Sequence, residues 1–172
     1  MEQNNALAPE WYAVHVRSRH EFMVADRLAL KEIETFLPQV ERVRKWKDRK
    51  KLISFPLFPG YLFVRTTRES QNLLRVLKVA GVVRIICTLP GEPDPIPEDQ
   101  IQSLKKLVDN KGELDPYPYL NEGQRVRITS GPLHGVEGIL VEKLDKHILV
   151  LSVDVLRQGV ALTINAGDVE KI

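Results

Sequence analysis

Basic side chains offer the most evident chemistry in this sequence, because they gather in one stretch of the chain. Between Trp11 and Arg84, 16 lysines and arginines accompany 7 acidic residues. The densest run extends from Arg42 to Lys51 and is interrupted only by a valine, a tryptophan and an aspartate. A solvated hairpin would account for such a run, and so would a surface that binds nucleic-acid phosphates. With a net charge of only +2, we expect any such contact to be local and assisted by another partner.

Catalytic and metal-binding chemistry is not indicated by the residue pattern. The sequence has no Ser/His/Asp or Cys/His order and no phosphate-cradling glycine loop, and its four scattered histidines lack the spacing of metal ligands. Cys87 is the single cysteine, which excludes an internal disulfide. We therefore expect that the chain is not an enzyme and has no catalytic residue, metal or cofactor. We also expect a monomer.

Hydropathy indicates a protein outside the membrane. No apolar run approaches the roughly 20 residues that are needed to span a bilayer. The polar, acidic start of the chain, Met1 to Pro9, is unlike a signal peptide. We expect a cytoplasmic protein.

Aromatic side chains are concentrated in the stretch Phe58–Val64, which reads Phe-Pro-Gly-Tyr-Leu-Phe-Val. The Pro-Gly pair indicates a turn, and the alternation that follows it places Tyr61 and Phe63 on one face of a strand. Leu62 and Val64 then lie on the other face. Both faces need cover, either from the protein's own helices or from a partner. A central strand of an ordinary α/β core and a partner-binding surface are both compatible with this pattern.

The order of the predicted elements indicates an α+β fold. Periodicity predicts a strand at 11–16, a helix at 19–31 capped by Ser18, extended structure at 33–40, an exposed hairpin reaching residue 52, a strand at 58–64, a helix at 70–78, a strand at 82–87 and a helix from 98 to about 110. This order favours a mostly antiparallel sheet sandwiched by helices.

Glycines and prolines then divide the chain. Residues 111–121 contain Gly112, Pro116 and Pro118 and show no hydrophobic periodicity, which is typical of a linker. Beyond them, short Val/Ile/Leu-rich runs alternate with glycines, which predicts a small antiparallel β-barrel. We expect a flexible N-terminus at 1–10, a first domain at 11–110, a linker at 111–121 and a barrel domain at 122–172.

The spacing of the barrel segment resembles the KOW motif of ribosomal proteins and transcription elongation factors. The residues that carry this resemblance are Gly123, Val126, Ile128, Gly131, Pro132, Gly135 and Gly138. The first domain resembles the N-terminal domain of the NusG superfamily. Its matching segments are Trp11-Tyr12-Ala13-Val14, the aromatic stretch Phe58–Val64, and Gly81-Val82-Val83. The two sets of motifs occur in the family's order.

This resemblance implies a transcription elongation or antitermination factor. In the NusG superfamily, the N-terminal domain binds the clamp helices of the large RNA polymerase subunit and contacts the non-template DNA strand, and such factors suppress pausing or termination. The KOW domain recruits a small-subunit ribosomal protein or the termination helicase Rho. The long basic segment after Val40 and the stretch Pro56–Pro59 look closer to the specialised antitermination paralogues than to the housekeeping factor.

The resemblance also suggests three sets of contact residues. The motif that binds polymerase corresponds to Phe58 and Tyr61. Contact with DNA is expected from Arg17, Arg19, His20, Arg27 and Arg75, mostly near the first strand–helix junction. The loop that carries the partner contact in the family's barrel corresponds to Val155 and Leu156, although both would equally serve to close the barrel core.

An RNA-binding or ribosome-associated KOW protein is the alternative function. It is supported by the basic first half and by the occurrence of KOW barrels in ribosomal proteins. The aromatic stretch Phe58–Val64 counts against it, because that motif resembles the polymerase-binding domain.

Overall fold

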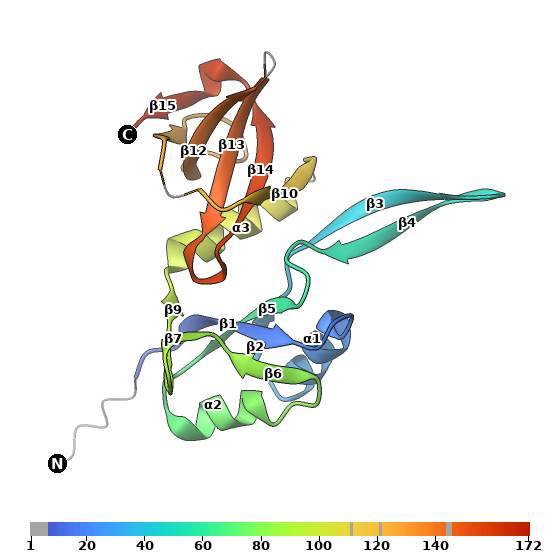
Figure 1. Cartoon of the computed structure of the whole chain (residues 1–172), viewed down its shortest axis with the longest axis vertical. Helices are drawn as coiled ribbons and strands as arrows, with labels where there is room; N and C mark the ends of the chain where they lie inside the picture. Colours follow the sequence, from blue (N-terminus) through green and yellow to red (C-terminus); the bar gives the residue numbers. More distant parts are fainter. Residues whose placement is uncertain (1–6, 111, 121, 144–145) are drawn as a thin grey trace. The chain divides into compact units, whose positions relative to one another are not determined.

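The computed structural model describes residues 7–110, 112–120, 122–143 and 146–172, and it divides the chain into two compact units (Figure 1). The first unit comprises Met1–Leu37 and Pro59–Glu98, and the second comprises Pro38–Phe58 and Asp99–Ile172. Most of the predicted flexible N-terminus, and both end residues of the predicted linker, lie outside the described residues. Within the described ranges, no helix is both long and apolar enough to cross a membrane.

The first unit combines a sheet with two helices. Its elements are β1 (Glu10–Val16), α1 (Glu21–Leu30), β2 (Glu34–Phe36), β5 (Tyr61–Thr66), α2 (Ser70–Leu77), β6 (Val82–Ile85), β7 (Cys87–Leu89), β8 (Glu92–Pro93) and β9 (Pro95–Ile96). The sheet has the order β2-β5-β1-β6, with β9 also paired to β1, and all of these pairs are antiparallel. The short strands β7 and β8 form a separate ladder.

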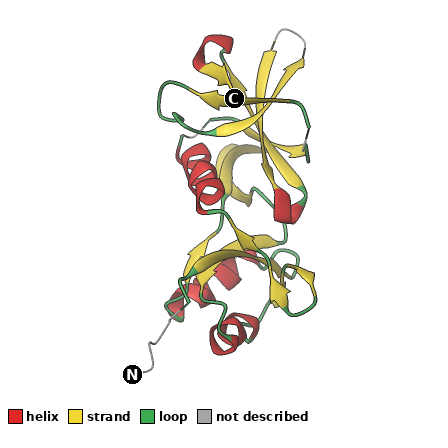
Figure 2. Ribbon diagram, turned by 90° about the vertical axis from the view of Figure 1, so that its left-hand side faces the viewer, coloured by secondary structure: helices red, strands yellow, loops and turns green. Residues whose placement is uncertain are grey.

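Helices α1 and α2 cover one face of this sheet, as Figure 2 shows. Alternation along β1 and β5 directs Tyr12, Val14, Leu62 and Val64 toward that face, where they pack against apolar side chains of both helices. Phe63 lies on the other face, and its ring stacks on that of Phe36 with centroids 6.0 Å apart. The predicted alternation of the aromatic stretch is therefore present, and both faces of β5 hold buried side chains.

Several predicted boundaries in the first unit are wrong. The strand expected at 82–87 divides into β6, which ends at Ile85, and β7, which begins at Cys87 in the separate ladder. Helix α1 begins at Glu21 and its N-cap is His20, which makes no capping hydrogen bond, so Ser18 is not the cap. Ser18 instead belongs to a turn that is closed by the bond from the His20 amide to the Arg17 carbonyl, 3.0 Å. Strand β5 begins at Tyr61 rather than at Phe58, because the intervening Pro-Gly pair forms a turn.

The predicted basic hairpin is confirmed. It consists of β3 (Gln39–Trp46) and β4 (Arg49–Pro56), which pair antiparallel from Gln39 opposite Pro56 to Trp46 opposite Arg49. A two-residue turn joins the strands. Every residue from Glu41 to Leu52 is exposed, as a segment rich in lysine and arginine requires.

The remainder of the second unit is α3 and an antiparallel sheet. Its elements are α3 (Glu98–Asp109), β10 (Leu114–Pro118), β11 (Gln124–Ile128), β12 (Glu137–Lys143), β13 (Lys146–Val153), the 3₁₀ turn Asp154–Leu156, β14 (Gln158–Ile164), the 3₁₀ turn Ala166–Asp168 and β15 (Val169–Lys171). The strand order is β10-β14-β13-β12-β11-β15. Closure of this sheet into a barrel stays a prediction.

Close packing inside this sheet depends on a glycine. A Cβ atom on Gly138 would lie 2.6 Å from the carbonyl oxygen of Val150 and 3.0 Å from the Leu149 side chain. The glycine therefore allows β12 to lie against β13 at a position where any side chain would collide with the backbone.

Strand β10 lies inside the segment that was predicted to be a linker. It pairs with β14 from Leu114 opposite Leu162 to Pro118 opposite Gln158. Pro116 and Pro118 obscure this strand in the sequence, because proline cannot donate to a ladder. The strand forms nonetheless because it occupies the sheet edge, where alternate residues point their N–H side away from the neighbouring strand.

Candidate functional site

The turn before β5 is anchored by a buried carboxylate. Gly60 adopts a φ of +83°, a left-handed conformation that favours glycine. Its amide donates a 2.7 Å hydrogen bond to Oε1 of Glu21, and its carbonyl accepts a 2.8 Å bond from the Val16 amide. Glu21 is only 5% exposed. A carboxylate this deeply buried is stabilised by such a bond, so Glu21 and Gly60 fix the turn and the strand that follows it.

Tyr61 follows this turn and lies next to a histidine. His15 of β1 is its cross-strand partner, and the two ring centroids lie 5.2 Å apart at an interplanar angle of 31°. Both side chains are half-buried, so part of each ring is accessible. Phe58, the other predicted anchor, is 1% exposed. Tyr61 thus has accessible ring surface, whereas Phe58 lacks it.

The first strand–helix junction presents two arginines at a tight turn. Arg19 adopts a φ of +64°, which is costly for a residue with a side chain. The Arg17 amide bonds the carbonyl of Gly81 at 2.9 Å, which ties the turn to the start of β6. Both arginines are exposed, and no described residue forms an ion pair with either guanidinium. His20, which is half-buried, has its Nδ1 2.9 Å from the Ser18 carbonyl oxygen.

The other two predicted DNA-contacting arginines each bind the backbone of a neighbouring element. Arg27 of α1 donates from Nη1 to the carbonyl of Ala80, 2.7 Å away. Arg75 of α2 donates from Nη2 to the carbonyl of Lys31 at the end of α1, 2.8 Å away. Each bond satisfies a carbonyl near the end of a helix and fixes the orientation of an exposed guanidinium. All five predicted DNA-contacting residues belong to the first unit.

The predicted partner loop lies in the 3₁₀ turn after β13. Leu156 is 9% exposed and belongs to the core of the second unit, whereas Val155 is half-buried. Three polar or aromatic side chains that no sequence pattern groups meet at this turn. Tyr119 donates a 2.9 Å hydrogen bond to Oδ1 of Asp154, and the guanidinium of Arg157 lies 5.1 Å from the Tyr119 ring centroid. The bond to Asp154 raises the pKa of the Tyr119 hydroxyl.

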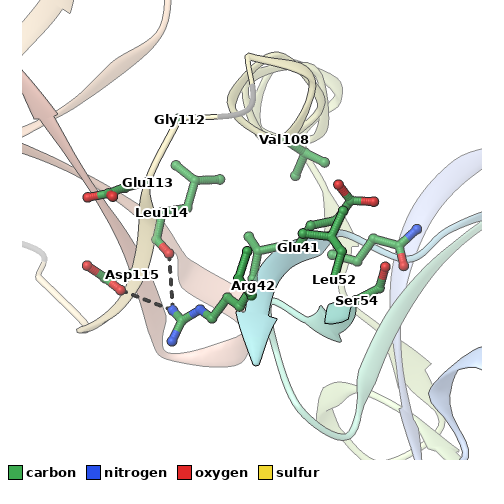
Figure 3. A pocket seen from close by; sticks show the side chains of 12 residues that line it. Glu41, Arg42, Leu52, Ser54, Val108, Gly112, Glu113, Leu114 and Asp115 are labelled. Atoms are coloured by element: carbon green, nitrogen blue, oxygen red, sulfur yellow. Dashed lines mark hydrogen bonds and ion pairs between the residues drawn. The ribbon is translucent and has the colours of Figure 1, made fainter. Parts of the chain in front are cut away.

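A groove of about 670 Å³ lies within the second unit, between the hairpin and β10 (Figure 3). Arg42 reaches across it and donates from Nη2 to Oδ1 of Asp115 at 3.0 Å and to the carbonyl of Leu114 at 3.4 Å. Its charge is therefore already matched by a carboxylate. Within the described ranges, no group of three or more His, Cys, Asp or Glu side chains is placed to hold a metal ion.

Trp46 is the surface residue whose importance the sequence did not reveal. It appeared there only as an interruption of the basic run. In the structure, it is 63% exposed at the end of the hairpin, whereas the other tryptophan, Trp11, is 1% exposed. Its position opposite Arg49, beside a two-residue turn, is the signal that marks it as a surface residue.

Comparison with known proteins identifies the family. The sequence model described as "Transcription termination factor nusG" matches residues 9–105. A NusG named as a transcription termination/antitermination protein from Campylobacter jejuni is 28% identical and covers 95% of this chain and 97% of its own. One from Borreliella burgdorferi is 25% identical and covers 96% of this chain and 100% of its own.

A solved structure supports the fold. The Thermotoga maritima NusG structure, titled for its domain interaction, aligns with a TM-score of 0.58 at 21% identity, over 95% of this chain and 97% of that one. The family match covers more than half of the chain, and the similar relatives extend over nearly all of it. This chain belongs to the NusG family.

Proposed function

We propose that this chain is a transcription elongation and antitermination factor that acts by binding RNA polymerase and has no enzymatic activity of its own. The observation that carries the proposal is the nearly full-length similarity to proteins named transcription termination/antitermination protein NusG. The departures after Val40 support a specialised role in that class. Residues 11–110 would form the polymerase-binding domain, and 122–172 the partner-recruiting domain.

The polymerase contact is proposed to centre on Tyr61 together with His15. The support is geometric, because both rings are partly accessible and lie side by side on adjacent strands. Aromatic anchors of this kind contribute much of the energy of protein interfaces. The target would be the clamp helices of the large subunit. Phe58 would act from inside the fold, because its ring is buried.

The test is to measure polymerase binding by the full chain with and without the Tyr61→Ala change. We expect affinity to fall by about 1–3 kcal/mol, as for a truncated aromatic anchor. Tyr117→Ala is the matched control, because Tyr117 is also a half-buried strand tyrosine but lies in β10. If Tyr61→Ala folds normally and binds polymerase as tightly as the control, the assignment of the contact is wrong. Phe58→Ala is a poor test, since emptying a buried aromatic site costs about 3–5 kcal/mol of stability.

Contact with the non-template strand is proposed to come first from Arg17 and Arg19, with His20, Arg27 and Arg75 beside them. The structure allows a variant that removes a charge without harming the fold. Arg19→Gly deletes the guanidinium at a position with φ of +64°, where glycine is favoured. Combined with Arg17→Gln, it should reduce crosslinking to non-template DNA in an elongation complex while polymerase affinity changes little. Unchanged crosslinking would contradict this contact.

By joining two sides of the polymerase cleft, such a factor would disfavour pausing. A coupling of about 1.4 kcal/mol suffices to shift a pause equilibrium tenfold. Pause lifetimes on a defined template should therefore shorten in the presence of the chain. Longer pauses or increased termination would contradict this role and would indicate that the chain promotes pausing or termination.

Recruitment of a small-subunit ribosomal protein or of Rho is proposed for the 3₁₀ turn that contains Val155 and Leu156. Val155 is the better surface candidate, because Leu156 is nearly buried. Val155→Ala in the full chain should weaken capture of the ribosomal protein, whereas Leu156→Ala should mainly lower stability. If Val155→Ala captures the ribosomal protein as well as the native chain does, the assignment of this turn to the interface is wrong.

The alternative function, an RNA-binding or ribosome-associated KOW protein, is favoured by one observation, the exposed basic hairpin. It predicts that the chain cosediments with ribosomes when polymerase is absent. Cosedimentation that requires polymerase would support the elongation factor instead.

A further inference from the structure

The outer half of the β3–β4 hairpin forms a surface that the proposed function leaves unused. We call residues Arg44–Lys51 the hairpin tip. It holds six basic residues and one acidic residue, Asp48, and all eight residues are exposed. Such a concentration of one sign of charge raises the local positive potential, and an anionic partner is the chemistry that complements it.

The cross-strand register of the tip indicates that its charges do not serve the stability of the hairpin. Lys45 lies directly opposite Lys50, and Arg44 lies directly opposite Lys51. Directly opposed residues on neighbouring strands have Cβ atoms about 5 Å apart, and like charges at that distance destabilise the pair. Arg44 gains a cation–π contact with Phe55, 5.7 Å from its ring centroid. The two lysines have no comparable contact among the described residues, so an anion between them would relieve a repulsion that folding leaves in place.

Trp46 distinguishes this surface from a merely basic one. The residue is 63% exposed, although a tryptophan normally buries most of its large apolar area. Because cross-strand partners share a face, Trp46 and Arg49 lie on the same side of the ribbon, together with Arg44 and Lys51 two residues further along each strand. An accessible aromatic ring beside several cations provides stacking for a base and neutralisation for the adjoining phosphates.

We propose that the hairpin tip binds single-stranded nucleic acid, with an unpaired base stacked on Trp46 and the backbone phosphates held by the surrounding lysines and arginines. An unpaired strand fits better than a duplex, because only unstacked bases offer their faces to an aromatic ring. Single-stranded DNA and single-stranded RNA present the same chemistry, so both are tested. The proposal goes beyond the polymerase and junction contacts above and requires neither of them.

The experiment measures tryptophan fluorescence of the full chain during titration with a mixed-sequence oligonucleotide, in separate single-stranded DNA, single-stranded RNA and duplex DNA arms. Trp11 is buried, so quenching by a stacked base reports on Trp46. We expect quenching by single strands and tighter binding to them than to duplex. A preference between the DNA and RNA arms identifies the natural source. Equal binding of duplex and single strands, or binding without quenching, would overturn the proposal.

Substitutions separate stacking from charge, with affinity followed by the anisotropy of a labelled oligonucleotide. Trp46→Ala should weaken single-strand binding about tenfold, within the range for loss of one stacked base, while Trp46→Phe should retain most of the affinity. The double change Arg49→Gln and Lys51→Gln, at two exposed positions on the same side of the ribbon as Trp46, should reduce the slope of log affinity against log salt by about 1.4, as expected for two phosphate contacts on a single strand.

A matched control rules out a general effect of charge. The double change Lys146→Gln and Lys171→Gln removes the same charge from exposed positions in β13 and β15. It should leave the salt slope nearly unchanged. If the control lowers affinity as much as the tip variant does, or if Trp46→Ala binds like the native chain, the assignment of the site to the hairpin tip is refuted. Circular dichroism of each variant confirms that the fold is retained.

Discussion

The hydrogen bond between Glu21 and the Gly60 amide yields a sharp prediction about how the candidate polymerase contact is held in place. Glu21→Ala removes the buried carboxylate that accepts the 2.7 Å bond from the Gly60 amide. A hydrogen bond to a charged group contributes about 1.5–3 kcal/mol, and the free energy of unfolding of the first unit should fall by that amount. Glu21→Gln keeps an oxygen acceptor but loses the charge, so it should lose about half as much.

Two measurements check this reasoning. Urea unfolding followed by circular dichroism gives the change in stability, and hydrogen exchange of the Gly60 amide, measured by NMR, reports the turn itself. Asp26→Ala is the control, because Asp26 is an exposed acid on the same helix. If Glu21→Ala and Asp26→Ala have equal effects, or if the Gly60 amide keeps its protection in Glu21→Ala, the carboxylate does not anchor the turn.

Two other predictions concern the second unit. Gly138→Ala would place a Cβ atom 2.6 Å from the Val150 carbonyl oxygen, so urea unfolding should show a loss of about 1–3 kcal/mol, as for overpacked sites; an unchanged midpoint would contradict the close approach. The Asp168 pKa is lowered by hydrogen bonds from Ser130 and Asn165, so their stabilising effect is present above the unfolded value near 3.8 and is lost as pH falls through the folded value. An NMR titration of the Asp168 carboxyl should therefore show a higher pKa in Ser130→Ala than in the native chain, and an equal pKa would refute this cause.

Periodicity predicted the fold well where one force dominates. The helices at 70–78 and 98–110 and the basic hairpin correspond to α2, α3 and β3–β4, because amphipathic spacing or charge alone determines their exposure. The prediction was wrong where two local signals competed. Ser18 is a good capping residue, but the bond that closes the turn from Arg17 to His20 moves the helix start beyond it. Strand β10 was missed because the sequence does not reveal that it lies at a sheet edge.

The candidate sites were predictable as segments but not as surfaces. The resemblance selected both Phe58 and Tyr61, yet only the structure distinguishes the buried ring from the accessible one. Similarly, sequence adjacency could not separate Val155 from Leu156, since a single turn of 3₁₀ helix directs neighbouring side chains differently. The Glu21–Gly60 bond joins residues 39 apart in the sequence, which no local pattern indicates.

The β3–β4 hairpin is a two-stranded ribbon, so neither of its strands has a second neighbour among the described strands. Each edge offers unpaired backbone donors and acceptors to which another chain can add a strand, and lysines along such edges are a common protection against aggregation. Val43 and Leu52 are 59% and 56% exposed, and burial of these apolar side chains would make such pairing favourable. Neutralising the lysines of the tip should therefore promote self-association at high protein concentration, and the same charges that attract a nucleic acid would keep the protein soluble.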